Sequence, residues 1–107
     1  MSEYFRGDVV IANVRIDGRN ERKMRPVVVL GRGGFSGSVY ACPITSREPF
    51  DSSYVPIGLD DFEKGGLDLF DESYVLLSHA CTIRNSDVAG KRGKLTKESL
   101  KVIESRL

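Results

Sequence analysis

Arginine and hydroxyl side chains at the ends of apolar stretches are the residues of this sequence best suited to chemistry. Arg25 opens the stretch RPVVVL, and Thr45 and Ser46 follow the apolar run within CPITSRE. An arginine offers a rigid, permanently charged fork that matches phosphate, and hydroxyls can donate hydrogen bonds to the same anion. Side chains at strand ends can leave the core and meet on one rim, so the pattern predicts an anion site. The alternative is that these residues only cap strand ends.

Other kinds of catalytic or ligand site find less support in the sequence. The glycine-rich stretch GRGGFSG (31–37) matches neither phosphate-loop pattern, and its place between two apolar runs predicts a hairpin loop. His79 is the only histidine and no G-x-S-x-G elbow is present, so a Ser-His-Asp triad is excluded. A lone histidine in a strand is more often structural than catalytic. Cys42 and Cys81 lack CxxC spacing and a nearby histidine, which argues against a metal site and leaves a disulfide open.

Composition and charge describe the kind of protein that carries these residues. Of the 107 residues, 40% are hydrophobic and 29% are charged, so we expect one globular domain spanning residues 1–107. The net charge of +1 does not by itself indicate a nucleic-acid partner. The charges are nevertheless segregated, with an acidic segment at 48–72 and a basic one from residue 84 onward, which builds a local positive face or merely solvates loops. No stretch reaches membrane length and MSEYFRGD is no apolar leader, so we expect a cytoplasmic protein without membrane contact.

Short β-rich runs separated by turn residues must position these side chains. The continuous apolar run at 25–30 predicts a central strand with Pro26 at its start, and Pro56 marks its own strand as an edge strand. The polar loop at 15–24 is long enough to be functional. We expect strands at 9–14, 25–30, 38–44 and 53–58, one long strand or two short ones at 73–83, and a helical turn within 59–66.

One helix is predicted near the end of the chain. In LTKESLKVIESRL, Thr96 suits the N-cap, and Leu95 and Leu100 have the spacing of a hydrophobic staple. Leu100, Ile103 and Leu107 then form one apolar face at helical spacing. Several short strands, a long first loop and a terminal helix together predict a mainly β fold, a small and strongly bent barrel with the helix packed on it.

The order of the sequence pieces carries a family resemblance. RGDVV, RPVVVL, CPITS, VPI, GGL, SYVLL, TI and GKL follow one another from Arg6 to the terminal helix. At these separations the chain resembles the MazF/PemK family of toxins from toxin–antitoxin modules. The resemblance implies a dimeric SH3-like barrel of the MazF/CcdB kind. It also implies a sequence-specific, metal-independent endoribonuclease that needs no cofactor, cuts single-stranded RNA, often messenger RNA, and is inhibited by a cognate antitoxin protein.

The resemblance also implies roles for particular residues. Arg25 and Thr45 would be catalytic, with the RNA's own 2′-hydroxyl attacking the adjacent phosphorus. Pro26 and the strand after it would fix Arg25 toward the scissile phosphate. The residues expected to bind RNA are Asn20, Glu21, Lys23, Ser46 and His79.

Departures from the family pattern keep other functions open. Where PemK-like relatives carry an arginine and an aspartate that take part in the acid–base work, this chain has Leu76 and Ser78, and His79 replaces a family glutamine. One alternative is therefore a degenerate relative that binds RNA or an antitoxin-like partner without cutting. Another is a CcdB-like gyrase poison, but those toxins depend on a tryptophan near an apolar C-terminal end, and this chain has no tryptophan.

Overall fold

The computed structural model describes residues 4–14, 22–47, 49, 53–65 and 73–107. Short 3-10 turns lie at Leu59–Asp61, Leu77–His79 and Asn85–Asp87. The longer elements are β1 (Asp8–Val14), β2 (Lys23–Arg32), β3 (Ser38–Thr45), β4 (Tyr54–Ile57), β5 (Phe62–Gly65), β6 (Ser73–Leu76), β7 (Cys81–Arg84), β8 (Val88–Leu95) and α1 (Lys97–Ser105). The expected mainly β fold with a C-terminal helix is thereby confirmed.

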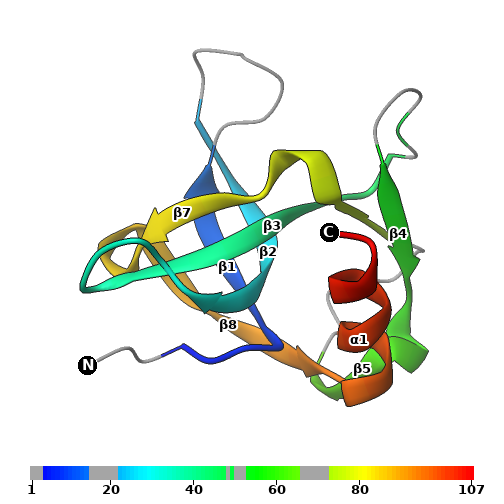
Figure 1. Ribbon diagram of the computed structural model, residues 1–107. Coiled ribbons are helices and arrows are strands. Elements are labelled where there is room, and N and C mark those ends of the chain that lie inside the picture. The colour runs from blue at the N-terminus through cyan, green and yellow to red at the C-terminus, as the bar shows by residue number, and fades with distance from the viewer. Residues whose placement is uncertain (1–3, 15–21, 48, 50–52, 66–72) are drawn as a thin grey trace.

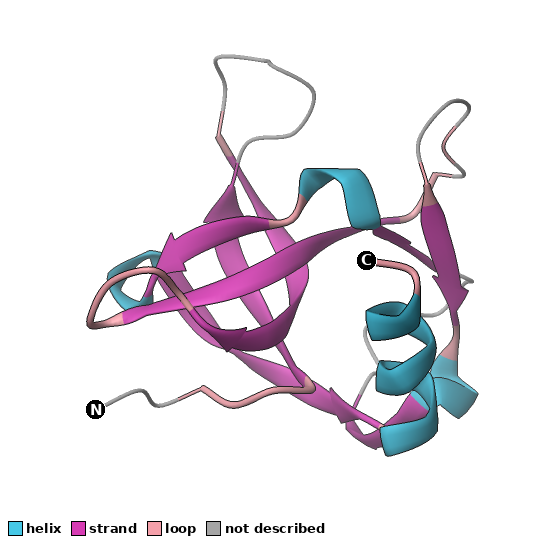
Figure 2. Ribbon diagram, in the orientation of Figure 1, coloured by secondary structure: helices cyan, strands magenta, loops and turns pink. Residues whose placement is uncertain are grey.

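The described strands form one strongly curled antiparallel sheet. Their order is β4-β6-β3-β2-β1-β8-β5, and β7 also pairs with β3. Figure 1 shows the sheet bending into a half-barrel, with α1 beside β4 and β5 where the curl stays open. Figure 2 shows α1 as the longest helical segment, with the 3-10 turns as shorter helical segments between strands. As predicted, the strand with Pro26 is central and the strand with Pro56 lies at the edge.

The core lies on both faces of the central strands. Val27 and Val29 belong to one buried cluster, whereas Val28 belongs to the other, because successive side chains of a strand point to opposite faces. The helix residues Leu100 and Ile103 cover the cluster that contains Val28. Burial on both faces explains why RPVVVL is continuously apolar instead of alternating.

The helix begins as its sequence predicted. The Thr96 hydroxyl oxygen accepts the Ser99 N–H at 3.2 Å, and Leu95 and Leu100 are buried in the same cluster. The Ser99 hydroxyl in turn donates to an Asp61 carboxylate oxygen at 2.6 Å, which ties α1 to the turn before β5. Leu107 was expected on the apolar face, but it is 55% exposed, because the helix ends at Ser105.

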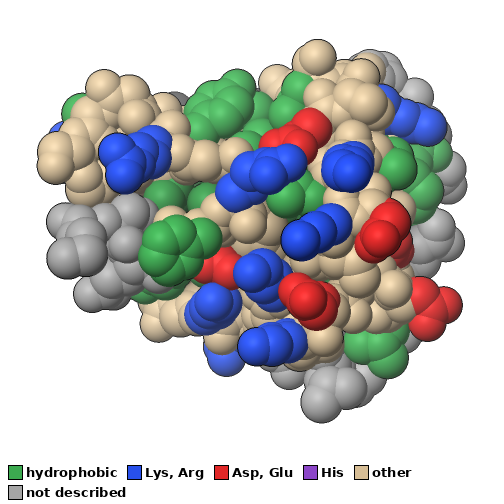
Figure 3. Space-filling view, turned by 60° about the horizontal axis from the view of Figure 1, so that its bottom comes forward, with side chains coloured by type: hydrophobic (Ala, Val, Ile, Leu, Met, Phe, Trp, Pro, Cys, Tyr) green, Lys and Arg blue, Asp and Glu red, His purple; other side chains and the backbone are tan. Residues whose placement is uncertain are grey.

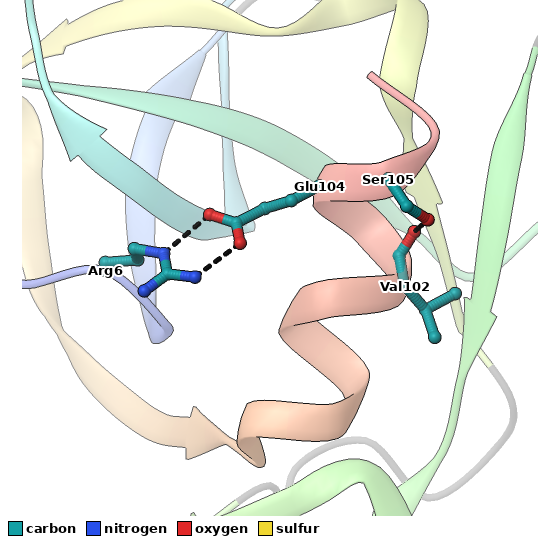
Figure 4. Close-up of polar contacts among 4 residues, drawn as sticks. All are labelled: Arg6, Val102, Glu104 and Ser105. Carbon is teal, nitrogen blue, oxygen red and sulfur yellow. Dashed lines mark hydrogen bonds and ion pairs between the residues drawn. The ribbon is translucent and has the colours of Figure 1, made fainter.

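The segment ahead of β1 is tied to later parts of the chain. The Arg6 guanidinium donates to both carboxylate oxygens of Glu104 in α1, at 2.6 and 2.5 Å (Figure 4). The buried Asp8 accepts the Phe5 N–H at 2.8 Å, and its other oxygen lies 3.1 Å from the Lys91 ammonium of β8. RGD is thus a structural turn that joins the first strand to β8 and to the helix.

Several strand boundaries differ from the prediction, among them those of β2, which was expected at 25–30 and runs from Lys23 to Arg32, and two strands, β5 and β8, were not predicted. Strand β3 was expected to stop near Pro43 but continues to Thr45. The missing N–H of Pro43 is tolerated because β3 changes partner there, pairing with β7 up to Ala41 and with β6 from Ile44. β8 was not predicted at all, since its sequence VAGKRGKL is rich in glycine and lysine. It nevertheless pairs with β1 on one side and β5 on the other.

Candidate functional site

A pocket of about 340 Å³ brings the predicted anion-binding residues together. Arg25 lines it from β2, and Thr45 and Ser46 line it from the end of β3. Ser73, at the start of β6, and Arg92, in β8, complete its polar lining. The sequence-based expectation that the arginine and the hydroxyls meet at one place therefore agrees with the structure, whereas Ser73 and Arg92 were not foreseen.

The rest of the pocket lining is apolar. Its walls come from β1, β2, β3 and β5, so the pocket spans the curled sheet. None of the described residues that line it is acidic, so its formal charge comes from two arginines. The apolar lining residues are Val9, Ile11, Met24, Pro26, Ile44 and Phe62. A pocket of this composition can hold an anion while offering flat apolar surface to an attached ring.

Arg25 is positioned by the pairing of β1 with β2. It lies opposite Ala12, and the following Pro26 lies opposite Ile11. The strand begins at Lys23, so Arg25 is its third residue and is held by the sheet on the β1 side. Because β2 continues into fully buried valines, the backbone that carries this half-buried arginine is fixed by the core.

The two hydroxyls differ in how firmly they are held. Thr45 is the last residue of β3, lies opposite Tyr74 of β6, and is half-buried. Its hydroxyl oxygen accepts the Arg47 N–H at 3.3 Å. Tyr74 packs edge-to-face on Tyr54 with ring centres 5.3 Å apart, which stiffens the strand pair beneath Thr45. Ser46 follows the strand and is exposed.

Other residues proposed from the sequence do not line the pocket. Lys23 is exposed at the start of β2, and His79 lies in the 3-10 turn beyond β6, at the opposite end of that strand from Ser73. Asn20 and Glu21 lie outside the described residues. The two positions that depart from the family pattern are also apart from the pocket, because Leu76 is buried in the sheet and Ser78 is exposed in the 3-10 turn.

Neither cysteine supplies a reactive group to the pocket. Cys42 is fully buried, and burial, helped by the neighbouring Cys81, raises the pKa of its thiol to about 11. Burial also raises the pKa of the Cys81 thiol, although the Arg22 charge opposes the shift. Both cysteines are free; they belong to different core clusters, on opposite faces of the sheet. This placement answers the question of a disulfide, because their side chains point apart.

Metal and membrane features are absent from the described part of the chain. Among residues 4–14, 22–47, 49, 53–65 and 73–107, no three His, Cys, Asp or Glu side chains gather as a metal site requires. No helix within these residues has the length and apolar character needed to cross a membrane.

The chain is similar to known toxins in sequence and in fold. The family model described as PemK-like, MazF-like toxin of type II toxin–antitoxin system matches residues 5–107. The Mycobacterium tuberculosis toxin MazF-mt6 superposes with a TM-score of 0.68 at 22% identity, covering 92% of this chain and 89% of that one. MazF (Form-I) from Deinococcus radiodurans gives a TM-score of 0.69 at 21% identity, covering 97% and 92% of the two chains. A mycobacterial endoribonuclease in complex with its cognate antitoxin gives 0.65 at 17% identity, covering 95% and 86%. No curated protein matches the chain.

Proposed function

The chain belongs to the PemK-like, MazF-like family of toxins of type II toxin–antitoxin systems, and on that basis we propose that it is an endoribonuclease that cleaves single-stranded RNA in the cytoplasm. The observation that carries the proposal is the pocket lined by Arg25, Thr45 and Ser46. These residues provide a fixed positive charge beside two hydroxyls, a combination suited to a phosphodiester.

The reaction that fits this pocket is an internal transesterification. The 2′-oxygen of the RNA bonds to the adjacent phosphorus while the bond from phosphorus to the 5′-oxygen breaks. The 2′-hydroxyl loses its proton and the leaving 5′-oxygen gains one, which gives a 2′,3′-cyclic phosphate and a 5′-hydroxyl. The step requires no water and no external nucleophile.

Arg25 would stabilise the charge that develops on the phosphorane. A guanidinium keeps its proton in proteins, so its role is electrostatic and not that of a base. Thr45 and Ser46 would donate hydrogen bonds to the non-bridging oxygens. The hydrogen bond that the Thr45 oxygen already accepts leaves its own proton available for donation.

The apolar wall would receive the bases. Phe62 and Ile11 line the same pocket, and the 52% exposed Met24 stands beside them. Unpaired RNA bases stack on aromatic rings such as that of Phe62 and pack against neighbouring aliphatic side chains, which bases paired within a duplex cannot do. This preference supports a single-stranded substrate, with base specificity set by the loops around the pocket.

An antitoxin and a second copy of the chain are the proposed protein partners. Support comes from the similarity to a MazE–MazF complex from Deinococcus radiodurans and to an endoribonuclease in complex with its cognate antitoxin. A pocket whose charge comes from two arginines would attract an acidic, initially disordered antitoxin segment that competes with RNA. A homodimer fits the family and the modest core; light scattering giving a monomer at micromolar concentration would count against it.

The test is incubation of the purified protein with a long RNA in EDTA, followed by gel analysis and identification of the product ends. We expect discrete fragments with 2′,3′-cyclic phosphate and 5′-hydroxyl ends. RNA with a 2′-deoxy sugar at the cut should survive. Cleavage of an all-DNA substrate would overturn the proposed chemistry. Binding of RNA without cleavage would favour the alternative of a degenerate relative that binds RNA without cutting it. The departures from the family pattern at Leu76 and Ser78 are the reason for that alternative.

A further inference from the structure

Arg92 occupies a β-bulge that faces the pocket. In the pairing of β1 with β8, Val9 lies opposite Gly93 and Val10 lies opposite Lys91. Arg92 is therefore an extra residue in β8 that has no partner position in β1. Bulges of this kind bend the strand and redirect a side chain, and they are frequent beside functional sites. Here the exposed Arg92 becomes part of the pocket lining.

The backbone on either side of the bulge is held in place. Lys91 pairs with the buried Asp8 at 3.1 Å. On the other strand, Gly65 lies opposite Gly93 with a φ of +70°, and a Cβ at Gly65 would stand 2.3 Å from the Arg92 carbonyl oxygen. Only glycine fits at that distance and that φ, so β5 presses directly on the Arg92 backbone. These contacts preorganise the bulge.

Arg25 and Arg92 reach the pocket from different sides. Their strands, β2 and β8, flank β1, so their backbones are about two strand spacings, roughly 10 Å, apart. They are also offset along β1, because Arg25 lies opposite Ala12 whereas Arg92 lies at the step between Val9 and Val10. The two charges are therefore separated both across the sheet and along the strands. Such a pair suits two anionic groups of one ligand better than a single anion.

The protein surface around β8 also carries many positively charged side chains. Figure 3 shows the face that carries β5, β8 and α1, where Lys and Arg side chains gather among a few acidic ones. Lys91, Lys97 and Lys101 are among the exposed cations of these elements. A polyanion that leaves the pocket past Arg92 therefore meets further positive charge at this face.

We propose that Arg92 binds the RNA phosphate next to the one that is cleaved. The inference rests on the proposed function in that the ligand is RNA, but it concerns binding and not the chemical step. Arg92 holds the RNA strand in position while Arg25 acts at the scissile phosphate. Removing Arg92 should therefore raise KM much more than it lowers kcat.

Binding is measured with a short fluorescent RNA of random sequence, 2′-O-methylated so that it is not cut, over a series of salt concentrations. Arg92→Gln should bind about tenfold more weakly than wild type, as expected for one charge-assisted contact. The slope of log K against log salt should fall by about 0.7, the value for one phosphate contact on a single strand. Arg92→Lys should recover part of the affinity and all of the slope.

Two further variants test whether binding depends on the position that the bulge gives Arg92 or only on the number of positive charges. Lys94→Gln removes one charge from the same strand at a residue that does not line the pocket, and its affinity should stay within about twofold of wild type. Gly65→Ala should weaken binding although Arg92 is still present, because the new Cβ displaces the bulge. Circular dichroism reports whether each variant folds.

The outcomes distinguish this inference from the proposed function. If wild type cuts RNA and Arg92→Gln matches it in affinity and salt slope, the role of Arg92 is wrong and the proposed function stands. If wild type binds RNA without cutting and Arg92→Gln binds more weakly, the role of Arg92 stands and the proposed enzyme is wrong. If wild type does not bind this RNA, the role of Arg92 is wrong, and if it also fails to cut a long RNA, the proposed function is wrong as well.

Discussion

Arg25 and Arg92 lie on β2 and β8, the two strands that flank β1, and both line the same pocket. The first of them is held by strand pairing opposite Ala12, and the second by a bulge. The sheet thus brings cations from the early and late parts of the chain to one site. This arrangement makes the contribution of each arginine separable by mutation.

Replacement of Arg25 by alanine should abolish toxicity and reduce RNA cleavage by roughly 10²–10³, the usual cost of losing one preorganised donor to a developing anion. The variant should remain folded, because the arginine is only half-buried and the adjoining valines keep the strand in the core. Cleavage rates and circular dichroism are measured together. Arg32→Gln, at the exposed far end of the same strand, is the matched control and should cut normally. Wild-type cleavage by folded Arg25→Ala would refute the assignment.

Replacement of Thr45 by alanine should be milder, at about tenfold in rate, because Ser46 lines the same pocket and can donate in its place. Ser46→Ala alone should cost less than that, since this exposed side chain is held less firmly. The double variant should lose more than the sum of the two single losses in free energy of activation. Additive losses in single-turnover rates would show that the hydroxyls act independently.

Replacement of His79 by glutamine should be nearly silent. The histidine lies in the 3-10 turn beyond β6 and does not line the pocket, so a structural role is expected. The pH–rate profile of the variant should therefore have the same shape as that of wild type. A large loss of rate together with loss of the acid limb of the profile would instead make His79 the general base.

The two thiols should stay free and react at different rates. Cys42 is fully buried with a pKa of about 11, whereas Cys81 is partly exposed, so iodoacetamide should label Cys81 first in the native protein at pH 8. Mass spectrometry without reductant follows the labelling. In a Cys81→Ser variant the remaining thiol should react only after denaturation. A native protein whose mass rises by two hydrogens on reduction would contain the disulfide that the geometry argues against.

The ion pair between Arg6 and Glu104 should make the stability of the folded protein depend on pH in the acidic range. The hydrogen bonds from Arg6 hold the pKa of Glu104 below its usual 4.5. Its contribution is therefore fully present above that value and is lost as the pH falls through the lower folded-state pKa. The difference in thermal midpoint between wild type and Glu104→Gln should be small near neutrality, as for exposed pairs, and should vanish once the pH falls below the lowered pKa of Glu104. A difference that grows on acidification would contradict the assignment.

The sequence alone predicted those strands and the helix that a pattern of neighbouring residues identifies. The apolar run beginning at Arg25 and the cap at Thr96 each identify their element without reference to any other segment. The meeting of Arg25 with Thr45 was also predictable, because both lie toward strand ends. β8 was missed because only its end residues, Val88 and Leu95, are large and apolar, so its strand character depends on its partners β1 and β5. The place of Arg92 depends on a register shift between distant segments, which no local pattern encodes.

The pairing of β1 with β8 has a consequence for synthesis of the protein. Of the described strands, β1 is made first, whereas β8, one of its two partners, is made last. At roughly 5–20 residues per second, β1 waits several seconds with one edge unpaired. The Arg92 side of the pocket does not exist during that interval. The pocket is therefore completed only after β8 has been made and has paired with β1.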